Sequence, residues 1–212
     1  MKKLRLCAAL TALLCLTGCG TASPEAPAAA TETETTAQTQ TDAGTLSEPA
    51  TETQPESNDP HRLPPLREFT AKTLDGAELT ADTLAACDVT VINIWQTTCP
   101  PCIAEMPEIA ELTSELPENV QFLTWCLDGM QQPDTAKAIL DDACFIGETI
   151  VEWDGDLNDM LSYILYTPTT VFLDRDGNQI GECIIGSAED AKTLYRDGIN
   201  AALEELGLET IH

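Results

Sequence analysis

Basic residues are scarce in this 212-residue chain, in which 10 Lys and Arg stand against 36 Asp and Glu and the formal net charge is −26. A protein that binds nucleic acid needs clustered Lys and Arg to contact phosphates, so this balance argues against a nucleic-acid partner. Histidine is also scarce, since only His61 and His212 occur. Few imidazoles are therefore available for metal binding or acid–base catalysis.

Long hydrophobic runs are absent after residue 20, which excludes a multi-pass membrane protein. The length fits one domain with additional segments, or two small domains. Cysteine, in contrast, is abundant, with nine residues. That number points to redox chemistry, a metal site or an oxidising compartment.

The first 18 residues have the features of an export signal. Lys2, Lys3 and Arg5 precede a short apolar stretch over residues 6–16, which is the pattern of a signal peptide. Residues 16–19 (LTGC) resemble the lipobox of bacterial lipoproteins. The resemblance implies cleavage before Cys19, lipidation of Cys19, and a location on the outer face of the bacterial cytoplasmic membrane. The alternative is an ordinary secretory signal with a chance cysteine.

The segment that follows the signal has a composition unlike that of a folded domain. Residues 20–60 contain no Lys, Arg or aromatic residue, and Leu46 is their only large aliphatic residue. Such a segment buries too little apolar surface to offset the entropy of ordering its backbone. We therefore predict a disordered tether over residues 19–62, anchored by the lipidated cysteine.

Residues 63–212 have the patterning of one α/β domain with a mixed sheet. We expect a hairpin near the start of this range and two buried strands at its centre, and a second hairpin followed by a last helix at its end. The predicted strands are 68–72, 77–79, 89–95, 120–127, 148–153, 169–173 and 179–185, with a turn at 174–177. The predicted helices are 100–116, 135–142, 156–163 with Asp154 as its cap, and a last helix to residue 206 that opens on a capping box of Ser187 and Asp190.

Cys99 and Cys102 lie where the strand 89–95 passes into a helix, in the sequence Cys-Pro-Pro-Cys. The free N–H groups and positive partial charge of a helix N-terminus stabilise a thiolate, so Cys99 is expected to attack disulfides. Cys102, three residues later, can then displace the captured partner. A zinc site would need about four ligands, and no second such pair exists. A structural disulfide of this span would constrain very little chain.

Two segments resemble the TlpA/ResA family of thioredoxin-like proteins. Residues 94–107 (IWQTTCPPCIAEMP) resemble the active-site segment of that family, and residues 166–177 (YTPTTVFLDRDG) resemble its cis-proline segment and following hairpin. The resemblance covers about residues 63–206. It implies a thioredoxin-like fold with an N-terminal hairpin and a central helix–strand insertion at roughly 128–165.

The resemblance also assigns roles to particular residues. Cys99 matches the nucleophile and Cys102 the resolving thiol of a redox-active disulfide. Pro168 matches the cis-proline that faces them, and Thr167 would offer backbone groups to an extended peptide. Glu105 matches a glutamate that tunes the cysteines or relays protons in some members; the alternative is an exposed helix acid.

Two tryptophan positions of the family need comment. Trp95 matches a family tryptophan that we include among the substrate-binding residues, although we favour a core position over a catalytic role for it. Thr98 stands where many members have a tryptophan directly before the first cysteine. This departure removes an apolar contact surface and bears on partner choice and reduction potential.

Four further cysteines lie in the domain: Cys87, Cys126, Cys144 and Cys183. They allow three pairings. We rank a Cys126–Cys144 disulfide first, because one ends a strand and the other follows the next helix. The alternative is four free thiols that behave as small apolar residues.

The family resemblance implies a membrane-tethered, extracytoplasmic thiol–disulfide oxidoreductase. We expect it to need no cofactor or metal and to act as a monomer. Its expected partners are disulfides of exported proteins, such as apocytochrome c or oxidised surface proteins, and a CcdA-like membrane thiol donor. A thiol peroxidase commonly has threonine where this chain has Gln96, and it uses an arginine, which is scarce here. A copper chaperone needs a wider cysteine spacing and a histidine. A non-catalytic binding module displayed on the tether remains the alternative of another class.

Overall fold

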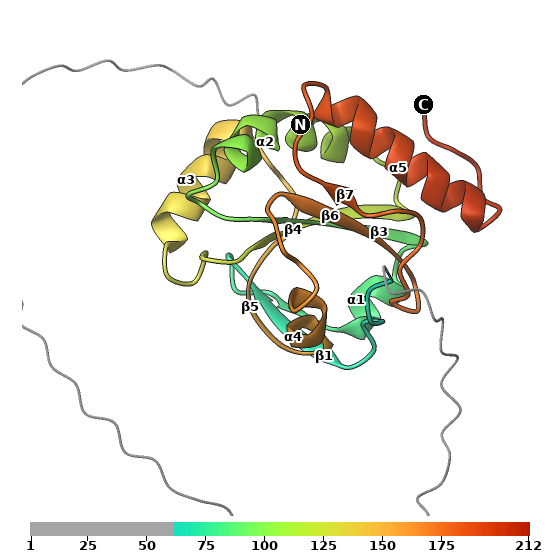
Figure 1. Cartoon of the computed structure of the whole chain (residues 1–212), viewed down its shortest axis with the longest axis horizontal. Helices are drawn as coiled ribbons and strands as arrows, with labels where there is room; N and C mark the ends of the chain where they lie inside the picture. The colour runs from blue at the N-terminus through green and yellow to red at the C-terminus, as the bar shows by residue number, and fades with distance from the viewer. Residues whose placement is uncertain (1–61) are drawn as a thin grey trace, which may run out of the picture. The chain divides into compact units, whose positions relative to one another are not determined.

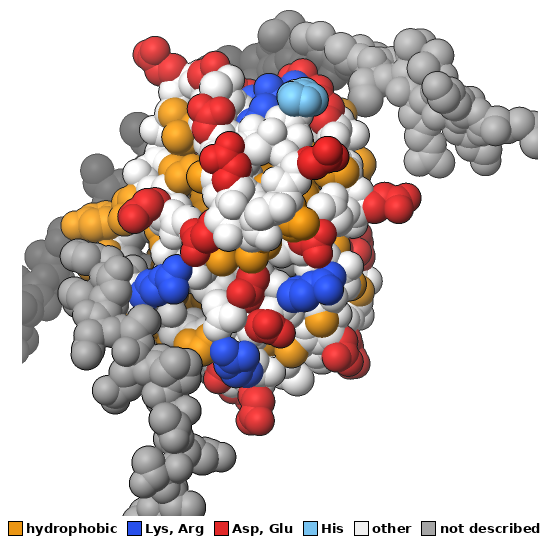
Figure 2. All heavy atoms as spheres, turned by 90° about the vertical axis from the view of Figure 1, so that its right-hand side faces the viewer, with side chains coloured by type: hydrophobic (Ala, Val, Ile, Leu, Met, Phe, Trp, Pro, Cys, Tyr) orange, Lys and Arg blue, Asp and Glu red, His pale blue; other side chains and the backbone are white. Residues whose placement is uncertain are grey.

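The computed structural model describes residues 62–212, which belong to one compact unit of the chain. The predicted signal peptide, the lipidated Cys19 and the tether up to residue 61 lie outside the described residues. The described part carries 7 basic and 28 acidic residues, a net charge of −21. Red carboxylates outnumber blue basic side chains on the face drawn in Figure 2.

Seven strands form a single mixed sheet in the order β2-β1-β5-β4-β3-β6-β7. Strands β3, β4 and β5 pair in parallel, and every other neighbouring pair is antiparallel. This is the predicted mixed sheet, and it includes the predicted N-terminal hairpin. The strands are β1 (Phe69–Thr73), β2 (Glu78–Leu79), β3 (Val89–Trp95), β4 (Val120–Cys126), β5 (Thr149–Gly155), β6 (Thr169–Asp174) and β7 (Ile184–Ile185).

Helices cover both faces of the sheet (Figure 1): α2, α3 and α5 lie on one face, and α1 and α4 lie on the other. They are α1 (Ala81–Ala85), α2 (Pro100–Glu115), α3 (Pro133–Ala143), α4 (Asp156–Leu161) and α5 (Ala191–Glu205). None of the helices within residues 62–212 is long and apolar enough to cross a membrane. The predicted insertion contains α3, β5 and α4, and β5 enters the sheet between β1 and β4.

Strand β3 contributes side chains to both layers of the core. All seven of its residues are buried, as its apolar run predicted. Val91 and Trp95 pack with the α2–α5 layer, whereas Ile92 and Ile94 pack with the α1–α4 layer, because side chains alternate across a strand. The antiparallel register sets Ile94 opposite Thr169, so the start of β6 lies beside the end of β3. This register places the segment before β6 next to the N-terminus of α2.

The second strand of the second predicted hairpin is much shorter in the structure than predicted. The predicted strand 179–185 is reduced to a single bridge between Leu173 and Gln179 and to the two residues of β7. The reason is Gly181, whose φ of +62° leaves the extended region and whose N–H bonds Glu205 Oε2 at 2.8 Å. The chain therefore turns away from the sheet before β7 rejoins it.

Both predicted caps were misplaced. Helix α5 begins after Asp190, whose carboxylate accepts the N–H of Thr193 at 3.0 Å, and Ser187 lies outside the cap. Helix α4 begins after Gly155, and Asp154 lies one residue too early to cap it. The Asp154 carboxylate instead accepts the N–H of Gly155 at 2.8 Å.

Candidate active site

Cys99 and Cys102 form a disulfide at the N-terminus of α2, with 5.3 Å between their Cα atoms. Cys99 is the N-cap residue, and Pro100 and Pro101 occupy the first two helical positions, where their missing N–H groups are tolerated. Cys102 is fully buried, whereas Cys99 is 8% exposed. An external thiol or disulfide therefore meets Cys99 before Cys102.

The segment before β6 lies directly against Cys99. The Thr167–Pro168 peptide bond is cis, as predicted from the sequence. The carbonyl oxygen of Thr167 is 3.6 Å from Cys99 Sγ. The structure thus brings together Cys99, Thr167 and Pro168, which are 68 to 69 positions apart in the chain.

No basic side chain of residues 62–212 bonds to either sulfur of the pair. Six of the seven basic residues form ion pairs with carboxylates: Arg62, Lys72, Lys137, Arg175, Lys192 and Arg196. The seventh, Arg67, donates to Asn178 Oδ1 and to the carbonyl oxygen of Asp176. A thiolate at Cys99 would depend on the helix N-terminus alone, which the two prolines deprive of two N–H donors.

Glu105, one turn beyond Cys102 on α2, is buried at 3% exposure. Its Oε1 accepts a hydrogen bond from the Tyr195 hydroxyl at 2.9 Å and from Asn93 Nδ2 at 3.1 Å. Burial raises the pKa of Glu105 to about 7, although the two hydrogen bonds act in the lowering direction, and nearby Glu108 contributes a smaller raising effect. Because the carboxyl is buried, the alternative of an exposed helix acid is wrong.

Asp128 fixes the segment that leads into the disulfide. Its carboxylate accepts the Thr97 N–H at 2.9 Å and the Thr97 hydroxyl at 2.6 Å. The Cys126 thiol also donates to Asp128 Oδ1 at 3.3 Å. These bonds hold Thr97, two residues before Cys99, against the end of β4.

The predicted Cys126–Cys144 disulfide is not formed, and all four additional cysteines are free. The Cys126 side chain is buried in the core beside Asp128, whereas Cys144 is exposed where α3 ends, so the two thiols do not meet. Burial raises the pKa of Cys126 well above its ordinary value and that of Cys183 to about 11. It also raises the pKa of Cys87. These three thiols are therefore poorly reactive at neutral pH.

The expected substrate-binding role of Trp95 is wrong. Its side chain is 0% exposed and packs in the core beneath α2, so it offers no surface to a partner. The alternative core position is the correct one.

Sequence reasoning missed Asn93, Asp128, Thr170 and Tyr195, which surround the predicted residues. The signal for Asn93 was present, since it is the one amide in the buried run of β3. Tyr195 gave no signal, because it lies 90 positions from Glu105 and the contact between them depends on how α5 docks.

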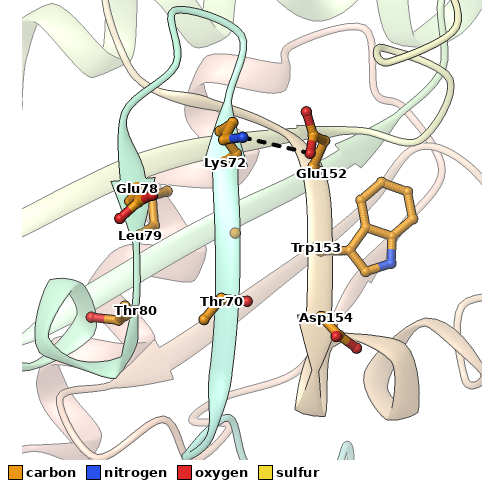
Figure 3. A pocket seen from close by; sticks show the side chains of 9 residues that line it. Thr70, Lys72, Glu78, Leu79, Thr80, Glu152, Trp153 and Asp154 are labelled. Atoms are coloured by element: carbon orange, nitrogen blue, oxygen red, sulfur yellow. Dashed lines mark ion pairs between the residues drawn. The ribbon is translucent and has the colours of Figure 1, made fainter.

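A groove of about 370 Å³ lies at the β2 edge of the sheet, over β1, β2 and β5 (Figure 3). The side chains of Lys72 and Glu152 point toward each other there and form an ion pair at 3.8 Å. No cysteine or histidine lines the groove. Among residues 62–212, no group of three or more His, Cys, Asp or Glu side chains is arranged to hold a metal ion.

Solved structures of low sequence identity share this fold. A thiol:disulfide interchange protein of the thioredoxin family from Chlorobium tepidum TLS is 20% identical, with a TM-score of 0.53 over 66% of this chain and 99% of that chain. A DsbF homologue from Corynebacterium diphtheriae is 16% identical, with a TM-score of 0.51 over 68% of this chain and 94% of that chain. The predicted thioredoxin-like fold is thereby confirmed.

Comparison with curated proteins gives no match. The profile of the AhpC/TSA family matches residues 64–179, more than half of the chain. The match contains the disulfide, Glu105 and the cis-proline, and it agrees with the expected class of thioredoxin-like oxidoreductases. The chain belongs to the AhpC/TSA family of thioredoxin-fold proteins.

Proposed function

We propose that this protein is a membrane-tethered, extracytoplasmic oxidoreductase that reduces disulfides of exported proteins through Cys99 and Cys102. The observation that carries the proposal is the disulfide at the N-terminus of α2, with only Cys99 near the surface and the carbonyl of Thr167 beside it. Those are the elements that thiol–disulfide exchange requires.

The exchange proceeds from the reduced pair. The Cys99 thiolate attacks one sulfur of the partner disulfide, and the other partner sulfur leaves as a thiolate and takes a proton from water. Cys102 then loses its proton and attacks Cys99 Sγ, which breaks the mixed disulfide and releases the second partner sulfur. The partner gains two electrons, and the Cys99–Cys102 disulfide described above is the product.

The rim of the site favours an extended, apolar stretch of polypeptide. Large apolar side chains in the neighbouring chain segments are exposed: Ile103, Tyr163, Leu165, Tyr166 and Ile185. Ile103 follows Cys102, Leu165 and Tyr166 precede Thr167, and Ile185 lies opposite Thr169 on β7. Exposed apolar groups of this kind mark interaction surfaces, and the backbone of Thr167 can bond an extended segment. Exported proteins that have not finished folding present such segments.

The electrostatics of the site favour reduction over oxidation. A dithiol becomes a strong oxidant when the protein stabilises its reduced, thiolate form. Here Pro100 and Pro101 occupy the first two helical positions and have no backbone N–H to donate, and no basic side chain of residues 62–212 bonds either sulfur. The weakly stabilised thiolate therefore favours the direction in which this pair gives up its electrons.

The remaining parts of the proposal concern the membrane. Lipidation of Cys19 and the tether over residues 19–62 would hold the domain outside the cell membrane, where a CcdA-like thiol donor could return electrons to the pair. Apocytochrome c or oxidised surface proteins would be the recipients. The names of the structural relatives, a thiol:disulfide interchange protein and a DsbF homologue, support thiol exchange as the chemistry.

The experiment is insulin reduction by the purified chain with dithiothreitol as electron source. The wild type and Cys87→Ala, a matched change of a half-buried thiol just before β3, should both accelerate insulin precipitation. Cys99→Ala should be no faster than dithiothreitol alone. Equal rates for Cys99→Ala and the wild type would favour a binding module in place of an enzyme.

A further inference from the structure

Four polar side chains lie together inside the apolar layer between the sheet and helices α2 and α5. They are Asn93 on β3, Glu105 on α2, Thr170 on β6 and Tyr195 on α5, and each is less than 4% exposed. We call these four residues the polar cage. Burial of polar groups costs free energy unless they are hydrogen-bonded, so a cage in this position calls for a reason.

The bonds of the cage converge on one oxygen of one carboxyl group. Tyr195 and Asn93 both donate to Glu105 Oε1. Asn93 Nδ2 also lies 2.9 Å from Thr170 Oγ1, which accepts its second proton and fixes the direction of the amide. The Tyr195 ring packs edge-on against Phe122, with 5.9 Å between centroids, so its hydroxyl is held in place from behind.

The other carboxyl oxygen has no partner. Glu105 Oε2 is buried and makes no hydrogen bond to any of the described residues. Cys102 precedes Glu105 by three positions on the same helix and is fully buried as well. Side chains three residues apart are neighbours on a helix face, so the Glu105 carboxyl, with its unpartnered oxygen, is a neighbour of the Cys102 side chain.

The family resemblance gives the glutamate at this position a proton-relay role, and its Oε2 is the oxygen left to take the proton of Cys102. We propose that Tyr195 and Asn93 are the positioning residues for this role, because they hold Glu105 and stabilise its ionised form. This inference rests on the proposed function, because Cys102 must lose a proton in order to displace the partner. The thiol proton moves to Oε2, the Cys102 thiolate attacks Cys99 Sγ, and the partner sulfur leaves with the electron pair of the broken bond. Glu105 then returns its proton to solvent.

The charged and titratable groups that face Glu105 are few. Helix α2 contributes Cys102 and Glu108, and helix α5 contributes Tyr195. Strands β3 and β6 contribute only Asn93 and Thr170, which do not titrate. A change in the titration of Glu105 on removal of the Tyr195 hydroxyl therefore reports on the cage.

Tyr195→Phe removes that hydroxyl and keeps the ring that packs on Phe122. A hydrogen bond to an ionised acceptor stabilises the ionised form, so its loss should raise the midpoint of Glu105 by about one pH unit. At neutral pH the fraction of ionised Glu105 would then fall about fivefold, and single-turnover resolution of a mixed disulfide would slow by the same factor.

The direct test is a ¹³C NMR titration of the Glu105 carboxyl in the oxidised full chain. The wild type should titrate near pH 7, Tyr195→Phe about one unit higher, and Tyr163→Phe, which alters an exposed tyrosine, like the wild type. Asn93→Val, which removes the second donor, should also raise the midpoint and serves if Tyr195→Phe does not fold.

Unchanged or lowered midpoints in both cage variants would overturn the inference. Since the titration uses the oxidised protein, it gives an answer without turnover. A wild type that fails to reduce insulin while its cage titrates as described would count against the proposed function alone. An active wild type whose pH–rate profile does not move upward in Tyr195→Phe would count against the cage alone.

Discussion

Replacement of Glu105 by glutamine should change how the stability of the protein depends on pH. The folded protein holds the pKa of this carboxyl at about 7, against an ordinary value of 4.5. Between those two values the folded state binds a proton that the unfolded state has released. Wild-type stability from this group is therefore complete below about pH 4.5 and is lost as the pH rises through 7. A glutamine amide carries no charge at any pH, so the free energy of unfolding of Glu105→Gln does not have this pH-dependent decrease.

The expected size of this stability difference follows from the rise in the pKa of Glu105. A rise of 2.5 pH units between the unfolded and folded pKa, at about 1.36 kcal/mol per unit, corresponds to about 3 kcal/mol. The free energy of unfolding of Glu105→Gln relative to the wild type should increase by this amount between acidic and mildly alkaline pH. A difference of that size moves a urea midpoint by more than about 1 M.

The assay is urea denaturation of the oxidised chain, followed by tryptophan fluorescence at several pH values. Glu118→Gln, which alters an exposed carboxylate, is the matched control, and the common effect of the other acidic residues cancels in the comparison. A Glu105→Gln difference that stays flat across the pH range would refute the reasoning, because it would mean that the carboxyl is not desolvated.

The Cys102→Ala variant should accumulate mixed disulfides at Cys99 in cells, because it lacks the thiol that releases the partner. Thiol-trapping gels should show these species, and their absence would contradict the two-cysteine mechanism. Gly177→Ala should lower the free energy of unfolding by more than about 2 kcal/mol in urea melts, because Gly177 has φ +75° and an added Cβ would collide with the backbone of Leu66. Gly76→Ala, with φ +85° and open space around it, should cost only about 1 kcal/mol, and equal costs would disprove the close approach.

The parts of the fold that could be predicted carry strong local signals. The run of β3 is apolar enough to be buried on both faces, and the double proline after Cys99 marks the start of α2. Cys99, Cys102 and Pro168 could be placed because short motifs carry their identity. The cis peptide and the position of Thr167 beside Cys99 were implied by the family resemblance of those motifs.

The parts that could not be predicted depend on tertiary contacts. Cys126 is buried at the end of β4, whereas Cys144 is exposed where α3 ends, and the sequence pattern does not report where the end of α3 docks. The cap of α5 lies three residues later than the predicted cap at Ser187, because residues 187–190 are not helical and Asp190 bonds the Thr193 N–H. Tyr195 joins Glu105 only through the docking of α5 on α2.

The most direct test of the central claim is the reduction potential of the Cys99–Cys102 pair, measured by equilibration of the purified chain in redox buffers. The weakly stabilised thiolate predicts a reducing pair, near thioredoxin at about −270 mV. A value near the oxidant DsbA at about −120 mV would contradict the account, because electrons would then flow into this protein from its partners.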